Sequence, residues 1–348
     1  MHTLSAIGML GLLIVVHELG HFLMARILGI KVSRFAIGFG PILWKVMLGK
    51  TEYSLRLLPF GGFVGFPEDD PDSGVDKNDP DLLANRPVVE RAMVVAAGPL
   101  VNLIAPLFIL ATLFAIGGMP QTLNEPGVVI LKVAKAGGAE VAGLRKKDVI
   151  LRMADGPVSM PQEFSMRMGS ISANQPVELQ VSRDGRILVL QVTPDNQGKI
   201  GVVLAANAKT IYRQGTNPGE LLMASVEGYG RIAAMTFESL GMLARGEAGI
   251  EDLAGPVGIV AVAAEASAAR SLDLILIAAL VSFNLGIFNL LPLPALDGFH
   301  LGCFALEAVR GKPLKENVLK AISNAGLVAL MGLLVVLVAM DTLRLLEG

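Results

Sequence analysis

The chain has 348 residues, of which 53% are hydrophobic and 17% charged, and its formal net charge is −2. Its mean hydropathy of +0.59 is too high, and its charged fraction too low, for an ordinary soluble domain. The balanced charge excludes the strongly basic face that nucleic-acid binding needs, so we expect no nucleic-acid partner. The one cysteine, Cys303, excludes an intramolecular disulfide and a zinc site built from several cysteines.

Four segments are apolar over a length that can cross the ~30 Å hydrocarbon layer of a membrane. They cover residues 4–27, 92–117, 272–293 and 325–345. The first segment could be mistaken for a signal peptide. It lacks a basic start and a small-residue cleavage site, so we expect it to be a permanent span in contact with membrane lipid.

The first span carries three ionisable residues, His17, Glu18 and His21. His17 and His21 are four positions apart, so a helix places both imidazoles on one face, where one metal ion can bind them. Glu18 is then placed to take a proton from a metal-bound water, as in the H-E-x-x-H pattern of zinc proteases. Chance is the alternative, but the cost of burying ionisable groups in lipid argues against it.

Residues 34–66 combine glycines with short β-prone runs, and the side chains from Tyr53 to Leu57 alternate as in a strand. One interpretation is an amphipathic sheet lying on the membrane. The other is a re-entrant sheet whose edge strand pairs with an extended substrate. The sequence does not decide between them. The acidic residues 67–81 that follow are expected to form a solvent loop.

The second span contains Pro99 and Asn102, which need local partners, so this part of the helix should pack against other helices. We interpret Asn102 as a hydrogen-bonded residue at a kink.

Further along, residues 218–245 predict an amphipathic helix with charges at Glu220, Glu227 and Arg231. These charges favour a helix on the membrane surface.

Residues 126–205 read as one soluble domain, with strands near 128–131, 149–151, 177–181 and 188–192 and helices near 138–143 and 160–171. The run Ala136–Leu144, followed by 147–150, resembles a PDZ domain of the bacterial protease type, in which a groove binds an extended peptide or a chain terminus. Lys146 and Lys147 stand where such domains usually have Pro-Gly.

The end of the third span holds Asn284, Asn289, Pro292, Pro294 and Asp297 at membrane depth. The first and third spans run in the same direction, so their carboxyl ends lie on the same side of the membrane. A catalytic zinc usually has three protein ligands. Asp297 is our choice for the third ligand and His300 is its competitor, because the sequence does not rank them.

Several basic residues lie on the side of the membrane where the first and third spans end. They flank the ends that carry the metal motif, at Arg26, Lys31, Arg34, Arg86, Arg91, Arg310, Lys312, Lys315 and Lys320. The positive-inside rule therefore predicts that the metal end is cytoplasmic and that the PDZ-like domain is outside.

HELGH in the first span, GPLVN in the second, the PDZ-like domain and NLLPLPALDG in the third together resemble the site-2 protease family, most closely its bacterial RseP type. The resemblance covers essentially the whole chain. It implies that His17, His21 and Asp297 bind one zinc ion and that Glu18 is the catalytic base. It also implies that residues 51–66 clamp the substrate.

The resemblance further implies which residues contact or orient the substrate: Asn284, Asn289, Tyr53, Leu55, Leu57, Gly61 and Gly62. Two features depart from the pattern. The chain has room for one PDZ domain where close relatives often have two, and Phe299 replaces the usual glycine after Asp-Gly.

The expected fold is a polytopic α-helical membrane protein with four transmembrane helices, a re-entrant membrane β-sheet and one extracytoplasmic α/β PDZ domain. Its parts are an N-terminal membrane domain (1–125), the PDZ domain (126–205), a linker with the amphipathic helix (206–271) and a C-terminal membrane domain (272–348).

The expected function is zinc-dependent intramembrane proteolysis in the bacterial inner membrane. Its substrates would be transmembrane proteins already cut by an upstream site-1 protease, such as anti-sigma factors or remnant signal peptides. The alternatives are a PDZ membrane scaffold without proteolysis and a metal-ion transporter.

Overall fold

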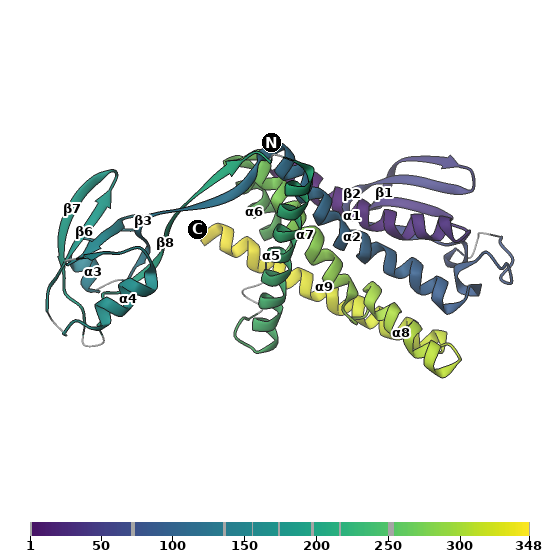
Figure 1. The fold of residues 1–348 in the computed structure, drawn as a ribbon. Helices are drawn as coiled ribbons and strands as arrows, with labels where there is room; N and C mark the ends of the chain where they lie inside the picture. The colour runs from purple at the N-terminus through teal and green to yellow at the C-terminus, as the bar shows by residue number, and fades with distance from the viewer. Residues whose placement is uncertain are drawn as a thin grey trace. The chain divides into compact units, whose positions relative to one another are not determined.

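A computed structural model describes residues 2–70, 74–134, 137–154, 156–172, 175–195, 198–215, 217–249 and 254–347. The chain forms two compact units (Figure 1). The first combines Met1–Gly117 with Gly215–Gly348, and the second is Gly118–Gln214.

The first unit contains the long helices. They are α1 (His2–Ile27), α2 (Val88–Gly117), α5 (Pro218–Ala244), α6 (Pro256–Ala269), α7 (Ser271–Leu290), α8 (Asp297–Arg310) and α9 (Glu316–Glu347). Among the described residues, four helical segments are long and apolar enough to cross a membrane: His2–Ile27, Val88–Gly117, Leu272–Leu290 and Asn317–Arg344. Each of them overlaps one of the four predicted spans.

Helix α2 packs against both α1 and α7, and glycines allow the close approach. A Cβ atom on Gly20 of α1 would be 2.6 Å from the carbonyl oxygen of Ala97. A Cβ atom on Gly286 of α7 would be 2.9 Å from the carbonyl oxygen of Pro99. Between membrane helices, small residues at the contact replace the hydrophobic driving force with close backbone packing. Glycine is therefore required at both crossings.

A proline fixes one further contact between α2 and α7. Pro106 lies inside α2 and has no N–H, so the carbonyl of Asn102, four residues earlier, loses its helical partner. The hydroxyl of Ser282 on α7 donates a hydrogen bond to this carbonyl at 3.0 Å. Both Asn102 and Ser282 are fully buried. This bond fixes the level of Asn102 against α7.

The segment between α1 and α2 forms two bent strands, β1 (Arg34–Leu48) and β2 (Thr51–Gly65). Because both strands bend, the pairing produces four neighbouring segments in the order 62–65, 34–37, 52–55 and 44–48. Among the described residues, segment 62–65 is paired only with 34–37, whereas 52–55 is paired on both sides. One outer edge of this sheet is therefore segment 62–65.

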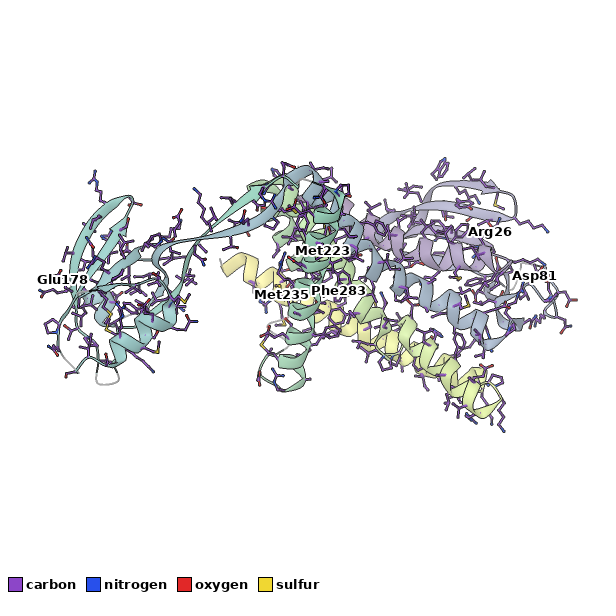
Figure 2. All side chains as sticks on the ribbon, viewed as in Figure 1. Arg26, Asp81, Glu178, Met223, Met235 and Phe283 are labelled. Atoms are coloured by element: carbon purple, nitrogen blue, oxygen red, sulfur yellow. The ribbon has the colours of Figure 1, made fainter. Side chains whose placement is uncertain are left out.

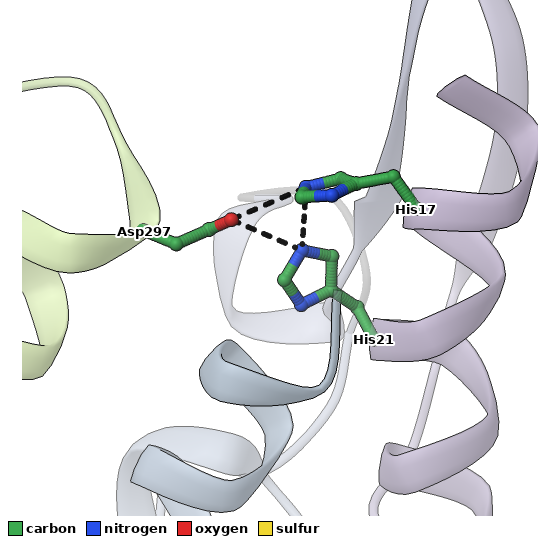
Figure 3. Close-up of side chains that lie close together, drawn as sticks. All are labelled: His17, His21 and Asp297. Carbon is green, nitrogen blue, oxygen red and sulfur yellow. Dashed lines mark hydrogen bonds and ion pairs between the residues drawn. The ribbon is translucent and has the colours of Figure 1, made fainter. Parts of the chain in front are cut away.

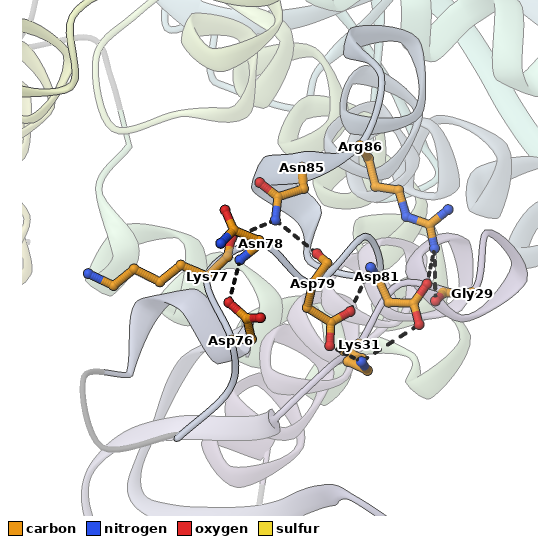
Figure 4. Close-up of polar contacts among 9 residues, drawn as sticks. All are labelled: Gly29, Lys31, Asp76, Lys77, Asn78, Asp79, Asp81, Asn85 and Arg86. Carbon is orange, nitrogen blue, oxygen red and sulfur yellow. Dashed lines mark hydrogen bonds and ion pairs between the residues drawn. The ribbon is translucent and has the colours of Figure 1, made fainter.

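A network of polar contacts ties the chain before α2 to the end of α1 (Figure 4). The Lys31 ammonium forms an ion pair with Asp79, and this hydrogen bond holds the pKa of the Asp79 carboxyl below its ordinary value. Arg86 donates to Asp81 at 2.9 Å and to the carbonyl of Gly29 at 3.2 Å. The described part of the acidic segment is thus attached to the residues that directly follow the histidine-bearing helix.

Helix α5 packs against α2 and α7 along one face. The buried residues of that face are Ser225, Gly228, Ile232 and Thr236. On other faces, Met223 and Met235 are exposed, whereas Phe283 of α7 is buried (Figure 2). The amphipathic helix expected at 218–245 is therefore present and packed against two membrane helices. Its place on the membrane surface stays a prediction.

The second unit is a sheet with two short helices. Its elements are β3 (Met119–Val133), α3 (Gly138–Val141), β4 (Val149–Met153), β5 (Gly156–Pro157), α4 (Pro161–Gly169), β6 (Val177–Arg183), β7 (Arg186–Val192) and β8 (Val202–Arg213). The strand order is β7-β6-β4-β3-β8, and β5 pairs with β4. Alternating residues of β4 and β6, such as Ile150 and Leu179, form the core with Phe164 of α4. Strand β8, which was not predicted from the sequence, pairs with β3 along a ribbon in which 119–124 lies beside 208–213.

Candidate metal centre and active site

Three side chains of the first unit converge on one point (Figure 3). His17 and His21 lie one turn apart on α1, and Asp297 is the first residue of α8. The Nε2 atoms of the two histidines are 3.2 Å apart. Asp297 Oδ2 is 3.2 Å from Nε2 of His17 and 3.5 Å from Nε2 of His21. Residues 280 positions apart in the chain thus form one cluster.

The geometry of this cluster fits zinc. Ligand atoms bound tetrahedrally at ~2.0–2.2 Å from one zinc ion lie about 3.3–3.5 Å from each other. The three separations of 3.2, 3.2 and 3.5 Å are close to this range. Asp297 Oδ2 is also buried and has no hydrogen-bond partner among the described residues. Two imidazoles and a carboxylate are a usual donor set for catalytic zinc, and they leave a fourth position for water.

The backbone of α2 orients His21. Its Nδ1 lies 2.9 Å from the carbonyl oxygen of Val94. A carbonyl only accepts, so Nδ1 carries the proton, and in the neutral ring the Nε2 lone pair faces Asp297 and His17. Gly98, one turn further along α2, leaves room for the ring.

The side chain of Asn102 lies against His17. Its Nδ2 atom is 3.2 Å from Nδ1 of His17, and the whole residue is buried. From the sequence, Asn102 is predicted to be a hydrogen-bonded residue at a kink, and its contact with His17 is not predicted. The asparagine within an apolar span was the available signal, because a buried amide needs a polar partner.

Glu18 is next to the outer segment of the sheet. A Cβ atom on Gly62 would be 3.0 Å from the Cγ atom of Glu18 and 3.8 Å from its carboxyl carbon. The outer segment 62–65 therefore passes directly beside the glutamate of the HExxH motif.

The other predicted residues of the sheet have different surroundings. Tyr53 and Leu55 lie in the inner segment, where Tyr53 pairs with both Phe35 and Val46, so this register does not support substrate pairing by these two residues. The side chain of Leu57 is exposed. Gly61 has a φ of +102° and lies under the Phe39 ring, where a Cβ atom would be 2.0 Å from a ring carbon.

The side chains of the two asparagines of α7 form hydrogen bonds with helices. Asn284 accepts a hydrogen bond of 2.6 Å from the hydroxyl of Thr236 on α5. Asn289 donates at 3.0 Å to the carbonyl of Leu285 in its own helix. Within the described residues, no hydrogen bond or ion pair joins either asparagine to the three converging side chains. Among the described residues, that group includes Asp297 and not His300.

Comparisons with known proteins identify the family of the chain. The family model for peptidase family M50 matches residues 5–333. A protein of Nostoc sp., provisionally named a zinc metalloprotease, is 40% identical over 99% of this chain and 97% of its own length. The chloroplastic membrane metalloprotease ARASP of Arabidopsis thaliana is 39% identical over 99% of this chain and 79% of its own length.

Among solved structures, the PDZ domain of an SdrC-like protein from Listeria monocytogenes covers 24% of this chain and 90% of its own. The two chains are 17% identical, and the TM-score is 0.22.

The family match over nearly the whole chain, the four apolar helices and the HExxH site define a membrane-bound zinc metalloprotease. The chain belongs to peptidase family M50, the site-2 protease family.

Proposed function

We propose that this protein is an intramembrane endopeptidase that uses one zinc ion, held by His17, His21 and Asp297, to cut transmembrane segments of other proteins. The observation that carries the proposal is the convergence of the three ligand atoms beside Glu18. The adjacent outer segment 62–65 adds a place where an extended chain can lie.

Bound zinc would supply a water of lowered pKa and would polarise the scissile carbonyl. The Glu18 carboxylate accepts the proton from the attacking water and then delivers it to the nitrogen of the leaving amine. The carbonyl of Val94 holds His21 in the orientation that the ligand role requires. Each of these groups belongs to α1 or α2, and the packing of glycines at their crossing sets the distances between them.

The substrate must be extended before it can be cut, because the carbonyls of a helix are hydrogen-bonded within it. Pairing of the extended chain with the free edge of segment 62–65 would replace some of the lost helical hydrogen bonds. Gly62 and Val64 are two residues apart in this segment, so their outward backbone groups face the same side. The close approach of Gly62 to the Glu18 side chain supports the idea that this segment borders the site. Asn284 and Asn289 are proposed to contact or orient the substrate backbone.

We place the protein in the bacterial inner membrane, with the metal site near the cytoplasmic side and residues 126–205 outside. The basic residues that flank the metal end, including Arg26 and Arg310, support this orientation. The outer domain would act as a filter or binding site for substrates already shortened by a site-1 protease. Anti-sigma factors and remnant signal peptides are the substrate classes that we propose.

The proposal is tested by cleavage of a single-span substrate in detergent, comparing the wild-type chain, Glu18→Gln and a sample treated with a zinc chelator. Glu238→Gln is the control, because Glu238 is exposed on α5. We expect cleavage by the wild type and by the control, and none in the other two samples. Cleavage that persists in Glu18→Gln would rule out this mechanism. Tight zinc binding without any cleavage would favour the transporter, and neither zinc nor cleavage would favour the scaffold.

A further inference from the structure

The two histidines of the site are oriented by different kinds of group on α2. His21 faces a backbone carbonyl, which can only accept a hydrogen bond. His17 faces the side-chain amide of Asn102, which can accept through oxygen or donate through nitrogen. The tautomer of His21 is therefore set by the backbone, whereas the tautomer of His17 depends on one side chain.

A neutral imidazole has one N–H, and its other nitrogen carries the lone pair that binds a metal. For Nε2 of His17 to be a ligand, Nδ1 must carry the proton and needs an acceptor. If the Asn102 nitrogen donated to Nδ1, the proton of the ring would be on Nε2, and that atom would be lost as a ligand. The ligand role of His17 thus requires the amide oxygen of Asn102 to face Nδ1.

The amide of Asn102 has unused capacity for this bond. Its nitrogen lies 3.2 Å from Nδ1, and its Oδ1 atom is buried with no hydrogen-bond partner in the described part of the chain. A half-turn of the amide exchanges the two atoms without moving the backbone. Oδ1 then receives the Nδ1–H of His17.

The position of Asn102 along α2 is fixed independently of its side chain. The backbone carbonyl, freed by Pro106, is held by the Ser282 hydroxyl at 3.0 Å. Asn102 and Ser282 are both fully buried. A substitution that keeps the backbone of residue 102 keeps this anchor, so its effect is confined to the partner of His17.

We propose that Asn102 is a positioning residue that holds His17 in the tautomer able to bind zinc, by accepting the Nδ1–H in its amide oxygen. This inference rests on the zinc site of the proposed function. It assigns to α2 the control of both histidine ligands, through the Val94 carbonyl for His21 and through Asn102 for His17.

Two substitutions of Asn102 should therefore have different effects on zinc affinity. Asn102→Asp keeps an acceptor of nearly the same shape and cannot donate when ionised, so it preserves the tautomer and forms a carboxylate–histidine–metal arrangement. Asn102→Leu has a similar volume and can neither accept nor donate. A role in packing alone would make leucine the milder change. A role as acceptor makes aspartate the milder change.

The experiment measures zinc affinity of the full chain in detergent by competition with a chromophoric chelator, for the wild type, Asn102→Asp and Asn102→Leu. Thr112→Val is the control, because Thr112 is exposed on α2 and its hydroxyl bonds to its own helix at Phe108. Loss of such a partner typically weakens metal binding about 10- to 100-fold, and we expect this for leucine. We expect aspartate and the control to stay within about threefold of the wild type.

Equal affinity of Asn102→Leu and the wild type would overturn the proposal, and so would an Asn102→Asp protein that is folded and binds zinc as weakly as the leucine variant. If the leucine variant does not fold, the aspartate comparison alone decides, since only an acceptor role predicts near-normal affinity. A wild-type chain without zinc affinity would instead remove the proposed metal site itself, and the inference with it.

Discussion

The imidazole of His21 lies against the backbone of Gly98 so closely that a Cβ atom at position 98 would be 2.2 Å from Nε2. This is the nitrogen that points to Asp297 and His17. Helix α2 contributes none of the three converging side chains, yet its backbone forms the wall against which the second histidine rests. The carbonyl of Val94 holds the His21 ring on one side, and Gly98, which has no side chain, leaves space for the ring.

Gly98→Ala should therefore damage the site without weakening the helix. Alanine favours a helix over glycine by about 1 kcal/mol, so any loss must come from the displaced imidazole. A ligand moved by a fraction of an ångström to 1 Å can cost about 100-fold in rate, and we expect a loss of that order with weaker zinc retention. Cleavage and zinc content are measured together.

Gly8→Ala on α1 is the matched control, because a Cβ atom at Gly8 would have no described atom within 4 Å. It should leave cleavage and zinc content unchanged. A Gly98→Ala protein that behaves like Gly8→Ala would contradict this account of His21.

The features that follow from periodicity and hydropathy could be predicted from the sequence. His17 and His21 share a face because a helix repeats every ~3.6 residues, and the spans follow from long apolar runs. For the third metal ligand, near the end of the third span, the sequence leaves two candidates, Asp297 and His300. Which of them converges with the histidines depends on where α8 begins after the turn at the prolines, and that helix was not predicted from the sequence.

Contacts that depend on the rotation of one helix against another could not be predicted. Asn102 is 85 positions from His17, and it reaches the ring only because of how α1 and α2 cross at Gly20. The role of the sheet is a similar case. The alternation around Tyr53 predicted a strand, but only the register shows that this strand is inner and that 62–65 is outer.

The hydrogen bond between Thr236 and Asn284 predicts a role for α5 in substrate cleavage. The Thr236 hydroxyl is 2.6 Å from Asn284 Oδ1, so it holds an amide that we propose to contact or orient the substrate. Thr236→Val keeps the shape and removes the donor. One hydrogen bond is worth about 0.5–1.5 kcal/mol, so we expect cleavage to slow about 2- to 10-fold while zinc affinity stays unchanged.

Thr236→Ser should restore cleavage, because serine keeps the hydroxyl. Thr342→Val is the control, since Thr342 is exposed on α9 and bonds to Val338 of its own helix. Normal cleavage by Thr236→Val, or equally slow cleavage by Thr236→Ser, would refute this role.

Arg91 of α2 forms an ion pair with Glu307 of α8. We expect this pair to hold α8 against α2. The Arg91 guanidinium also lies 5.0 Å from the centre of the Phe304 ring. Both charged side chains are mostly buried, so Arg91→Met leaves Glu307 without its partner. We expect stability to fall by about 3 kcal/mol, the low end for broken buried pairs, as measured by thermal unfolding in detergent.

The double variant Arg91→Met/Glu307→Gln should recover part of this loss, because it removes the unpaired charge. Arg245→Met is the control for an exposed pair, since Arg245 and Glu247 lie 2.8 Å apart and both side chains are more than half exposed. It should change stability by less than about 1 kcal/mol. Equal effects of Arg91→Met and Arg245→Met would show that the α2–α8 ion pair does not stabilise the protein.

In the second unit, the hydrogen bonds of the Asp148 carboxylate lead us to predict that stability falls in acid. Burial alone would raise the pKa of its carboxyl. Hydrogen bonds from Arg183 at 2.7 and 2.8 Å and from the Arg145 backbone at 2.8 Å outweigh burial and hold this pKa below its ordinary value. The unfolded chain has the ordinary value of about 3.9. The stabilisation is therefore fully present above that pH and is lost as the pH falls through the lower pKa of the folded state.

Hydrogen exchange of the β4 and β6 amides in the full chain, corrected for the intrinsic exchange rate, measures this effect. Protection should fall below about pH 4 in the wild type. Asp148→Asn should lose about 1.5–3 kcal/mol of protection at pH 7, because hydrogen bonds to a charged group are worth that much, and should show a smaller change in acid. Glu178→Gln, at an exposed position of β6, should follow the wild type. An Asp148→Asn protein with the same acid transition as the wild type would assign the transition to another carboxylate, because the asparagine cannot titrate.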